Sequence, residues 1–567
     1  MKRARRWILS PPADVSARPR FSTEVCPLPS IARILQGKGL LDDAQAEEFL
    51  RPRLRHLSDP FLLPHMQAAV DRILQAVTSR EKIVLYGDYD VDGVTSLALL
   101  SEVLRAYGVT PALFLPSRME EGYGLSREGV ARCWQTHHSQ LLIAVDCGTS
   151  SGAEIADLYH KGTDVIVIDH HEPKGELPEC VAVVNPKTSA KSSFGYLCSV
   201  GIVFKLCHAL LKTRPRLDFD LRRRLDLVAL GTVADIVPLV EENRILVHHG
   251  IREIARRRLL GLSKLMDVAG VRPPVAAEHI GFRLGPRLNA AGRLTTAEKA
   301  LSLLLTTDLS EAVALSAELD EQNRQRQSVE REIVDAAERK IAAQNLADLP
   351  AIVLGEHNWH PGVLGIVASR IARKYHRPSI IIGFDDEGLG KGSGRSIEGL
   401  SLVAALARSG EQLEKFGGHE MAAGLTIQEK NLGAFVSAFQ ETCGAVLSSE
   451  DLKPRLYLDA EITLADLTWE LLRWHELLQP FGQGSPQPLF LVRGVEPVAP
   501  PRLLKEKHLA VRFRQGRLQQ RAIYFGGAED PLPEPPWDVA FRIGANEYEG
   551  DTRLQMQVED LRSAGPI

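Results

Sequence analysis

The sequence predicts a multidomain protein of the α/β class, with two α/β lobes, a long helix between them and a small β-barrel near the carboxyl end. Three observations predict this fold. Short apolar runs alternate with helical stretches over residues 82–184, residues 293–349 contain no Gly or Pro, and short alternating strands follow residue 452. The 567 residues, 44% hydrophobic and 25% charged, suffice for several cores and exclude a mainly disordered chain.

The first lobe is predicted to be a parallel sheet covered by helices. Apolar runs of strand length occupy residues 82–86, 141–145, 164–168 and 181–184. Helical patterns lie between them, at residues 95–107 and 152–160. This alternation is typical of parallel strands joined by helical crossovers, so we expect helices on both faces of the sheet.

A long helix and a second α/β pattern follow. Residues 310–344 keep scattered apolar positions amid dense charge and predict one helix of about 50 Å, which suits a connector between lobes. A strand at 351–354, a helix at 363–376 and a strand at 379–384 precede a Gly-rich stretch, 390–396, which we expect to be a flexible loop. The predicted segments are an N-terminal segment (1–50), a first α/β domain (51–295), the connecting helix (296–349), a second α/β domain (350–448) and the barrel (449–567).

Composition restricts the compartment and the partners. Lys and Arg total 68 against 72 Asp and Glu, a net charge of −4, so the totals alone indicate no nucleic-acid or membrane partner. No apolar run approaches the ~18 residues of a membrane span. The seven cysteines are odd in number and scattered, which argues against a disulfide framework and a cysteine zinc site. We therefore expect a protein of the reducing cytoplasm.

Three aspartates, Asp88, Asp90 and Asp92, directly follow the first predicted strand. Their side chains share one face if the chain stays extended, and carboxylates this close repel one another unless a cation lies among them. Two alternatives stay open. One is an Asp-rich turn, and the other is an EF-hand calcium loop, although its twelfth position falls on Leu99 where Glu is required.

The next two predicted strands also end in polar residues. Asp146 follows one strand, and Asp169, His170 and His171 follow the next. In an open α/β sheet, ligands bind at the carboxyl ends of the strands, so these ends define one site, which Asp235 could complete. Oxygen and nitrogen donors without thiolates suit Mn²⁺ or Mg²⁺, and two such ions about 4 Å apart activate water and stabilise a phosphoryl transition state.

The individual roles within this site differ. One ring of the histidine pair can bind metal while the other donates to a phosphate oxygen. Asp169 suits an orienting role better than metal binding. Cys147, next to Asp146, is expected to be a buried thiol with no chemical role.

These residues, in this order, resemble the motifs of the DHH phosphoesterase superfamily. The matching motifs are Asp88-Tyr-Asp-Val-Asp-Gly, Asp146-Cys-Gly, Asp169-His-His and Ala234-Asp235. Further segments resemble the single-stranded-DNA-specific exonucleases within it: Glu121-Gly-Tyr-Gly-Leu125, Gly285-Pro-Arg-Leu-Asn-Ala-Ala-Gly-Arg293, Trp359-His-Pro-Gly362 and Gly417-Gly-His-Glu-Met-Ala-Ala-Gly424. The resemblance implies a 5′-to-3′ exonuclease of DNA repair and recombination that releases mononucleotides.

The resemblance also implies a fold and a set of ligands. The fold is a two-lobed DHH phosphoesterase with a DHH-associated, substrate-binding domain at residues 350–448 and a C-terminal OB-fold. The ligands of two Mn²⁺ or Mg²⁺ ions fall on Asp88, Asp90, Asp92, Asp146, His170 and Asp235. His171, with Asp169 beside it, falls next to the scissile phosphate.

Several residues are candidates for holding the DNA. Arg287, Asn289 and Arg293 could bind backbone phosphates, although an arginine that bridges helix ends is an equally open alternative. The resemblance suggests a 5′-phosphate site formed by Arg118, Ser393 and Arg395, and it places His419 near the substrate phosphate. Tyr123 could stack on a terminal base or be a core tyrosine.

A basic stretch marks the predicted barrel. Seven basic residues and one acid lie between Arg502 and Arg521, and they alternate with Phe513 as in an OB-fold that follows a single strand. Single-stranded DNA is therefore the expected partner of a monomer, with a helicase and a single-strand-binding protein as further partners and no membrane. Two other functions stay open: a phosphoesterase of the same superfamily for short oligonucleotides or cyclic dinucleotides, and a non-catalytic replication scaffold.

Overall fold

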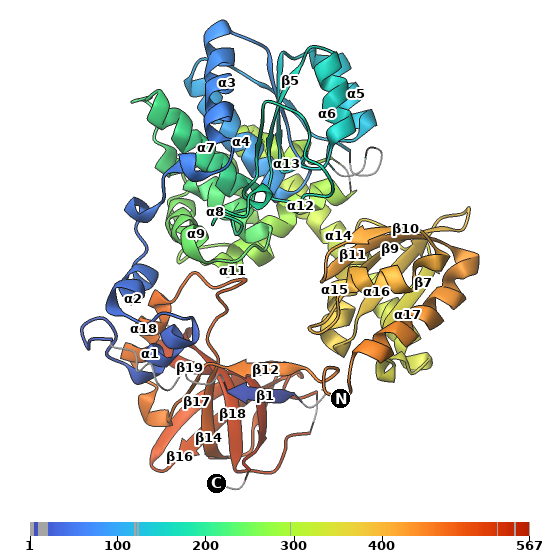
Figure 1. Cartoon of the computed structure of the whole chain (residues 1–567). Coiled ribbons are helices and arrows are strands. Elements are labelled where there is room, and N and C mark those ends of the chain that lie inside the picture. The colour runs from blue at the N-terminus through green and yellow to red at the C-terminus, as the bar shows by residue number, and fades with distance from the viewer. Residues whose placement is uncertain are drawn as a thin grey trace. The chain divides into compact units, whose positions relative to one another are not determined.

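The computed structural model describes residues 5–9, 21–117, 121, 124–294, 296–529, 531–548 and 551–565. They form two compact units, whose elements are labelled in Figure 1. The parallel-sheet unit comprises Glu48–Arg324 and Leu478–Gln487, and the barrel unit comprises the described residues of Met1–Glu47, Gln325–Leu477 and Pro488–Ile567. No helix within the described ranges is long and apolar enough to cross a bilayer.

The parallel-sheet unit is built on five parallel strands in the order β3-β2-β4-β5-β6. The strands are β2 (Ile83–Tyr86), β3 (Ala112–Phe114), β4 (Leu141–Val145), β5 (Asp164–Ile168) and β6 (Ala182–Val184). The predicted parallel sheet is confirmed. The sequence did not predict β3, because three residues at a sheet edge carry too short a pattern.

Alternate residues of these strands face two different cores. On one side, Ile83 and Leu85 pack in a core shared with α3, α4, α7 and α8. On the other side, Val84 and Tyr86 pack in a core shared with α5 and α6. These helices are α3 (Met66–Ser79), α4 (Val91–Ala106), α5 (Arg127–His137), α6 (Gly152–His160), α7 (Ser199–Thr213) and α8 (Leu225–Ala234). The sheet is buried on both faces, which leaves the ends of its strands as the place for a site.

A segment from much later in the chain completes this unit. We call Leu478–Gln487 the strap. The carbonyl of Gln483 accepts a hydrogen bond of 2.7 Å from the backbone N–H of Leu239. Arg244, only 3% exposed, donates to the carbonyl of Gln479 at 2.8 Å and stacks 3.7 Å over the ring of Phe49. The strap therefore packs against the loop that connects α8 to α9 (Glu241–Ala255).

Helix α14 (Leu309–Ala343) is the predicted long helix and has 35 residues. Its first part contributes Ala312 and Leu319 to the core of the parallel-sheet unit. Its last part contributes Ile333 and Ile341 to a core of the barrel unit. The shorter helices α10 (Leu260–Val268), α11 (Ala277–His279), α12 (Gly285–Leu294) and α13 (Glu298–Leu305) precede it. Residues 298–305 are therefore a helix of their own.

The barrel unit contains a second five-stranded sheet, in the order β10-β11-β9-β8-β7. Only the β7–β8 pair is parallel among its described pairings. The strands are β7 (Ile352–His357), β8 (Ser379–Phe384), β9 (Leu389–Arg395), β10 (Leu413–Gly418) and β11 (Ala422–Gln428), and the helices are α15 (Leu364–Tyr375), α16 (Leu402–Arg408) and α17 (Leu432–Val446).

The prediction of a flexible Gly-rich loop at residues 390–396 is wrong, because β9 occupies the middle of this sheet. Its glycines alternate, so they share one face of the strand. A Cβ on Gly390 would lie 2.5 Å from the ring of Phe384, and one on Gly392 would lie 2.8 Å from Leu425. Glycine is needed here because side chains pack directly on the backbone. The period of two was the available signal for a strand.

The predicted C-terminal barrel is confirmed. Strand β14 pairs with both β18 and β16, which closes the ring β14-β18-β19-β17-β16. The strands are β12 (Arg455–Leu458), β13 (Ala460–Glu461), β14 (Phe490–Pro497), β15 (Arg502–Leu504), β16 (His508–Gln515), β17 (Leu518–Tyr524), β18 (Trp537–Tyr548) and β19 (Asp551–Ser563), with helix α18 (Trp469–Leu477) before β14.

Phe513 on β16 belongs to the interior of the barrel. It is completely buried and packs edge to face on Trp537. Its neighbours Arg512 and Arg514 are exposed, because successive side chains of a strand point to opposite faces.

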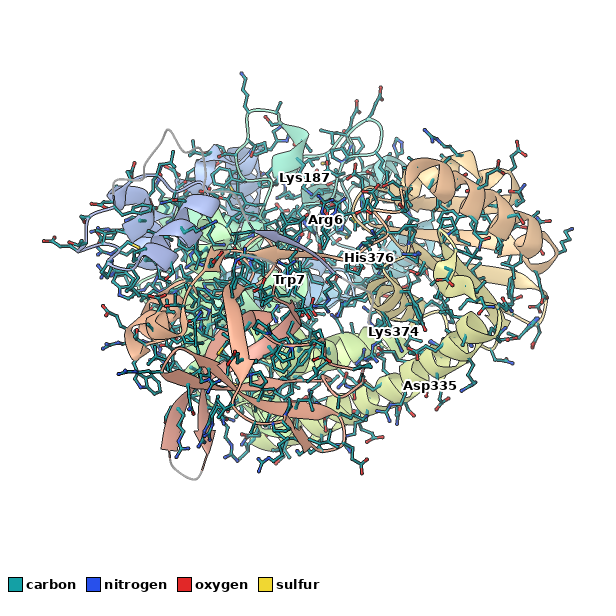
Figure 2. The ribbon with its side chains drawn as sticks, turned by 90° about the horizontal axis from the view of Figure 1, so that it is seen from below. Arg6, Trp7, Lys187, Asp335, Lys374 and His376 are labelled. Atoms are coloured by element: carbon teal, nitrogen blue, oxygen red, sulfur yellow. The ribbon has the colours of Figure 1, made fainter. Side chains whose placement is uncertain are left out.

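The N-terminal segment also belongs to this unit. Strand β1 (Arg6–Leu9) pairs in parallel with β12, and α1 (Pro29–Gly37) and α2 (Asp43–Leu50) follow it. Arg6 and Trp7 of β1 are labelled in Figure 2. The indole Nε1 of Trp7 donates to Asp560 at 2.9 Å, and the guanidinium of Arg562 lies 4.4 Å from its ring.

Candidate metal centre

The chain does not stay extended after β2. The three aspartates therefore do not lie on one face of an extended segment. Asp90 is the N-cap of α4 and accepts hydrogen bonds from the N–H groups of Asp92 at 2.8 Å and Gly93 at 3.2 Å. Helix α4 therefore starts at Val91, four residues earlier than predicted, and Asp92 lies in its first turn. Gly93 permits this turn, because a Cβ there would lie 2.4 Å from the carbonyl oxygen of Asp88.

Asp92 is completely buried and is held by the N-terminus of α7. Its Oδ2 accepts from the N–H of Ser199 at 2.7 Å, and its Oδ1 accepts from the N–H of Val200 at 2.8 Å. The hydroxyl of Ser199 donates to Asp146 at 2.9 Å. The start of one helix thus fixes two carboxylates from two different strand ends.

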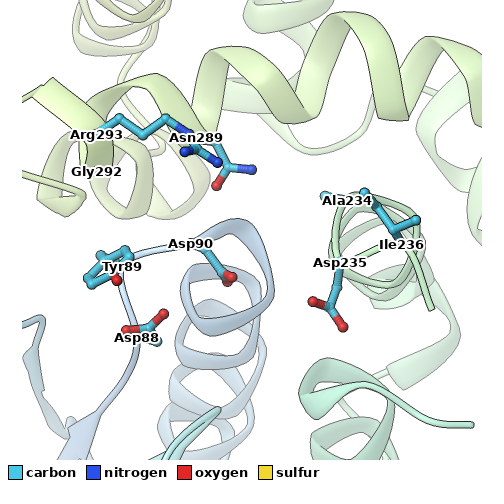
Figure 3. Close-up of a pocket in the computed structure, with 9 residues that line it drawn as sticks. All are labelled: Asp88, Tyr89, Asp90, Ala234, Asp235, Ile236, Asn289, Gly292 and Arg293. Carbon is cyan, nitrogen blue, oxygen red and sulfur yellow. The ribbon is translucent and has the colours of Figure 1, made fainter. Parts of the chain in front are cut away.

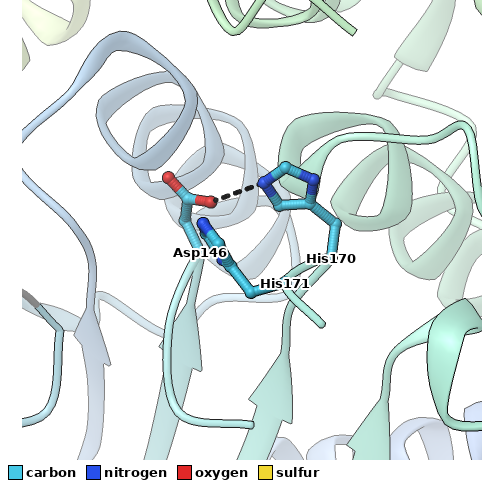
Figure 4. A group of neighbouring side chains, drawn as sticks. All are labelled: Asp146, His170 and His171. Atoms are coloured by element: carbon cyan, nitrogen blue, oxygen red, sulfur yellow. Dashed lines mark ion pairs between the residues drawn. The ribbon is translucent and has the colours of Figure 1, made fainter. Parts of the chain in front are cut away.

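Asp146, His170 and Asp235 meet at one point. The Nε2 of His170 lies 3.5 Å from Asp146, 3.6 Å from Asp235 and 4.0 Å from Asp92 (Figure 4 shows Asp146 with both histidines). Asp146 has a φ of +64°, a left-handed conformation that is uncommon outside Gly, Asn and Asp. Neither His170 Nε2 nor Asp235 Oδ2, both buried, has a hydrogen-bond partner in the described part of the chain.

The six predicted ligands therefore gather in one place. Oxygens of Asp88, Asp90 and Asp146 lie within 4.8 Å of one another and form one group of donors. Asp92 and Asp235, together with Cys198, form a second group of the same size. A third group of the same size joins Asp146 to His170 and His171, and His170 Nε2 also lies 3.6 Å from Asp235 of the second group. Adjacent groups of donors are the arrangement expected for two ions.

Electrostatics favour a cation among these groups. Burial, with Asp90 as a neighbour, raises the pKa of Asp92 to about 7. Burial and the surrounding carboxylates likewise raise the pKa values of Asp146 and Asp235 well above the usual range. Burial lowers the pKa of His170 to about 3, which keeps the ring neutral and able to bind metal. Since these groups repel one another as anions, they fit a divalent cation that would remove the repulsion.

Asp169 and His171 form a hydrogen-bonded pair beside this cluster, and a ring nitrogen of His171 lies within 4.8 Å of donor atoms of Asp146 and His170. Asp169 Oδ1 accepts from His171 Nδ1 at 2.7 Å and from two backbone N–H groups, and its Oδ2 accepts from the N–H of Thr149. Although burial opposes it, the hydrogen bonds from His171 and Thr149 hold the pKa of Asp169 well below its usual range. The other ring nitrogen of His171 takes no part in this bond, so the pair has the geometry of a histidine oriented by a carboxylate.

A cavity of about 320 Å³ opens beside the acidic cluster (Figure 3). Its lining includes Asp88, Asp90, Asp235, Asn289 and Arg293. The Oδ1 of Asn289 accepts from the N–H of Val91 at 3.1 Å, which ties α12 to the start of α4. Two of the three predicted contacts on α12 therefore reach the site.

The third α12 residue, Arg287, does not line this cavity. Its Nε donates to Asp320 of α14 at 2.8 Å, and its Nη1 donates to the carbonyl of Arg283. The structure favours the helix-bridging alternative for Arg287.

Three of the other predicted DNA contacts belong to the barrel unit. Ser393 and Arg395 are on β9 of the barrel unit, where the guanidinium donates to the Ser393 hydroxyl at 3.2 Å next to Gly365 in the first turn of α15. His419 follows β10 and is exposed. Arg118 and Tyr123 lie outside the described residues.

Three residues of the centre were not found from the sequence. Ser199 and Cys198 lie at the start of α7, more than 100 residues after Asp92 along the chain, and no local pattern marks them. Ile236 follows Asp235, lines the cavity, and is 70% exposed with a φ of +62°. A β-branched residue in this conformation is strained, and such strain is common at functional sites. An exposed apolar residue directly after a motif aspartate was the available signal.

Comparison with known proteins agrees with this geometry. Residues 82–232 match the N-terminal domain of the DHH family, 340–445 match the DHHA1 domain, and 458–560 match the RecJ OB domain. The single-stranded-DNA-specific exonuclease RecJ of Haemophilus influenzae is 37% identical over 545 residues, covering 89% of this chain and 92% of that protein. The RecJ of Dickeya dadantii is 36% identical over 574 residues, covering 96% and 98%.

Solved structures agree as well. The crystal structure of RecJ in complex with Mn²⁺ from Thermus thermophilus has a TM-score of 0.84 and 32% identity, covering 99% of this chain and 80% of that one. The Mg²⁺ complex has a TM-score of 0.78 and 31% identity, covering 99% and 78%. The fold and the carboxylate–histidine centre define a phosphoesterase of the DHH superfamily. More narrowly, the chain belongs to the RecJ family of single-stranded-DNA-specific exonucleases.

Proposed function

We propose that this protein is a metal-dependent exonuclease that degrades single-stranded DNA from the 5′ end, hydrolysing phosphodiester bonds and releasing 5′-mononucleotides. The observation that carries the proposal is the gathering of five aspartates and His170 into adjacent groups of donors beside a cavity. The relatives named RecJ, and their complexes with Mn²⁺ and Mg²⁺, support it.

The proposed ligands of two Mn²⁺ or Mg²⁺ ions are Asp88, Asp90, Asp92, Asp146, His170 and Asp235. Bound ions would supply an activated water and neutralise charge on the phosphate. The chain contributes a preformed arrangement, since Asp92 and Asp146 are fixed by the N-terminus of α7 and Asp90 is fixed as a helix cap. Preformed charges need no reorganisation during the reaction.

We propose His171 as the residue that donates to a phosphate oxygen. Its Nδ1 is bound to Asp169, and we propose Nε2 as the atom that donates to the phosphate. The ring is 36% exposed at the site, whereas Asp169 is buried beneath it. Asp169 is accordingly a positioning residue for His171.

A basic face on the barrel favours a long polyanionic substrate. Arg512 on β16 stands directly opposite Arg521 on β17, and both are exposed. Neither has a carboxylate partner among the described residues. Like charges directly across a strand pair destabilise it, and a bound phosphate backbone would relieve the repulsion. This basic face distinguishes the proposal from a phosphoesterase for dinucleotides, which needs no such surface.

Further contacts and partners are carried over from the resemblance. We propose Asn289 and Arg293 as phosphate contacts at the cavity, and Ser393, Arg395 and His419 as contacts of the second α/β domain, with Arg118 and Tyr123 also expected to face the DNA. A role in DNA repair and recombination, a cytoplasmic location, a monomeric state, and a helicase or single-strand-binding protein as partners remain predictions.

Time courses on 5′-labelled and 3′-labelled single and double strands, with Mn²⁺, Mg²⁺ or chelator, test the function. We expect mononucleotides to be released from the 5′ end of single strands only when metal is present. Asp90→Asn should abolish release while the protein stays folded, because Asn is also a good N-cap. Release from the 3′ end, or equal rates on a long strand and a dinucleotide, would contradict the proposal.

The double substitution Arg512→Gln with Arg521→Gln tests the basic face. It should weaken binding of long strands, leave dinucleotide hydrolysis unchanged, and reduce the salt dependence of binding by about 1.4 in log–log slope, since each phosphate contact on a single strand contributes about 0.7. An unchanged slope would show that the DNA does not follow this face.

A further inference from the structure

The second group of donors in the metal centre contains a thiol. Cys198 is completely buried at the N-cap of α7. Its Sγ lies within 4.8 Å of a carboxylate oxygen of Asp92 and of one of Asp235. The sequence predicted a centre of oxygen and nitrogen donors without thiolates, so this residue changes the chemistry of the site.

The sulfur lies beside the acidic cluster. The thiol of Cys198 donates to the hydroxyl of Thr232 at 3.4 Å, and the same Sγ lies within 4.8 Å of the Asp92 and Asp235 carboxylates. Two buried atoms next to this group, His170 Nε2 and Asp235 Oδ2, have no hydrogen-bond partner in the described part of the chain and lie 3.6 Å apart. Buried polar atoms without partners point to a bound cation at this place.

We propose that Cys198, with Asp92 and Asp235, forms a site for a thiophilic divalent cation such as Zn²⁺, Co²⁺ or Cd²⁺ at one of the two metal positions. The inference deepens the proposed function, because it rests on the same ligand set. On binding, the S–H bond breaks, its proton passes to water, and a sulfur–metal bond forms with both sulfur electrons. No oxidant or reductant is needed.

The distances allow this coordination. Zinc binds thiolate sulfur at about 2.3 Å and carboxylate oxygen at about 2.0–2.2 Å, so two donors of one tetrahedral ion stand about 3.5 Å apart. The three donors of this group already lie within 4.8 Å of one another, so a bound ion requires any wider pair to close to that spacing. Cys198 is the N-cap of α7, the helix whose first N–H groups also hold Asp92.

The donor set predicts a selectivity that a purely oxygen and nitrogen centre lacks. Thiolate favours Zn²⁺ strongly over Mn²⁺ and Mg²⁺, which prefer carboxylate and water. A thiophilic ion should therefore displace Mn²⁺ from this position and inhibit nucleotide release. Losing the sulfur should weaken Zn²⁺ competition by about tenfold or more, as is typical when one partner of a metal site is removed.

Co²⁺ titration of the full-length protein, followed by absorption spectroscopy, tests the inference. We expect a thiolate-to-cobalt charge-transfer band in the unsubstituted protein that Cys198→Ser abolishes. Cys207→Ser is the matched control, because Cys207 is equally buried on the same helix but outside the cluster, and it should keep the band. A band that persists in Cys198→Ser would overturn the proposal.

A second measurement needs no variant. In ¹¹³Cd NMR of the unsubstituted protein, one resonance should show the downfield shift of a thiolate ligand. A spectrum with only oxygen and nitrogen ligands would overturn the inference. This test does not depend on whether Cys198→Ser folds. Parallel Mn²⁺ binding and nucleotide release separate the two proposals. If Mn²⁺ binds and supports nucleotide release but Co²⁺ and Cd²⁺ show no sulfur ligand, only this inference fails. If Mn²⁺ neither binds nor supports nucleotide release, the proposed function fails.

Discussion

Replacement of Asp235 by Asn should stabilise the metal-free protein and destabilise the metal-bound one relative to the unsubstituted chain. Asp235 Oδ2 is buried without a hydrogen-bond partner in the described part of the chain, and the side chain lies within 4.8 Å of the Asp92 carboxylate. Burial and Asp92 raise the pKa of Asp235. A carboxyl whose pKa is raised on folding lowers the free energy of unfolding as the pH rises above its pKa in the unfolded chain. At neutral pH Asp235 therefore destabilises the metal-free protein, and Asn removes this effect.

The magnitude follows from the distance. Two unit charges 4.8 Å apart repel by about 3.5 kcal/mol at an effective dielectric of 20 and by about 0.9 kcal/mol in water. Partial protonation of the cluster reduces this repulsion, so we expect Asp235→Asn to raise the free energy of unfolding by about 1–2 kcal/mol. For a unit of this size, 1 kcal/mol shifts Tm by about 2–4 °C, which gives a rise of roughly 2–8 °C.

Thermal unfolding in chelator and in Mn²⁺ measures both effects. Mn²⁺ at 100 times its Kd should stabilise the unsubstituted protein by about 2.7 kcal/mol, and Asp235→Asn should lose most of this gain, so the order of the two Tm values reverses. Asp335→Asn, an exposed position on the part of α14 that belongs to the barrel unit, is the control and should change stability by less than about 0.5 kcal/mol. A lower Tm of Asp235→Asn in chelator would refute the reasoning, because it would mean that Asp235 stabilises the fold without metal.

Three further substitutions test other parts of the structure. Asp169→Asn should reduce nucleotide release by about a hundredfold or more while Mn²⁺ affinity, measured by calorimetry, stays unchanged, because the His171 ring loses its charged partner. Gly93→Ala should weaken Mn²⁺ binding by about tenfold or more by displacing Asp88, whereas Gly152→Ala, where a Cβ meets nothing within 4 Å, should not. Arg244→Met should lower the free energy of unfolding by about 2–4 kcal/mol, because it leaves buried carbonyls unpaired. Hydrogen exchange of the strap should rise, and Arg244→Lys should restore it in part. Unchanged exchange would contradict the role of the strap.

Local sequence patterns were enough to predict the α/β class and to bring several acidic and histidine residues to one candidate site. Apolar runs of strand length, each followed by Asp or His, placed Asp88, Asp146 and His170 at the carboxyl ends of parallel strands, and the structure brings them together. Such predictions succeed because strand periodicity and strand-end position are local properties of the chain.

Which groups touch one another depended instead on the packing of the whole unit. The partners of Asp92 are the N–H groups of Ser199 and Val200, and Cys198 joins the centre beside them, more than 100 residues along the chain. Arg287 turned away from the cavity because Asp320 of α14 lies within reach of its guanidinium. Contacts of this kind depend on how helices pack across the sheet, and packing is set by shape and burial over the whole unit, so a local pattern does not carry them.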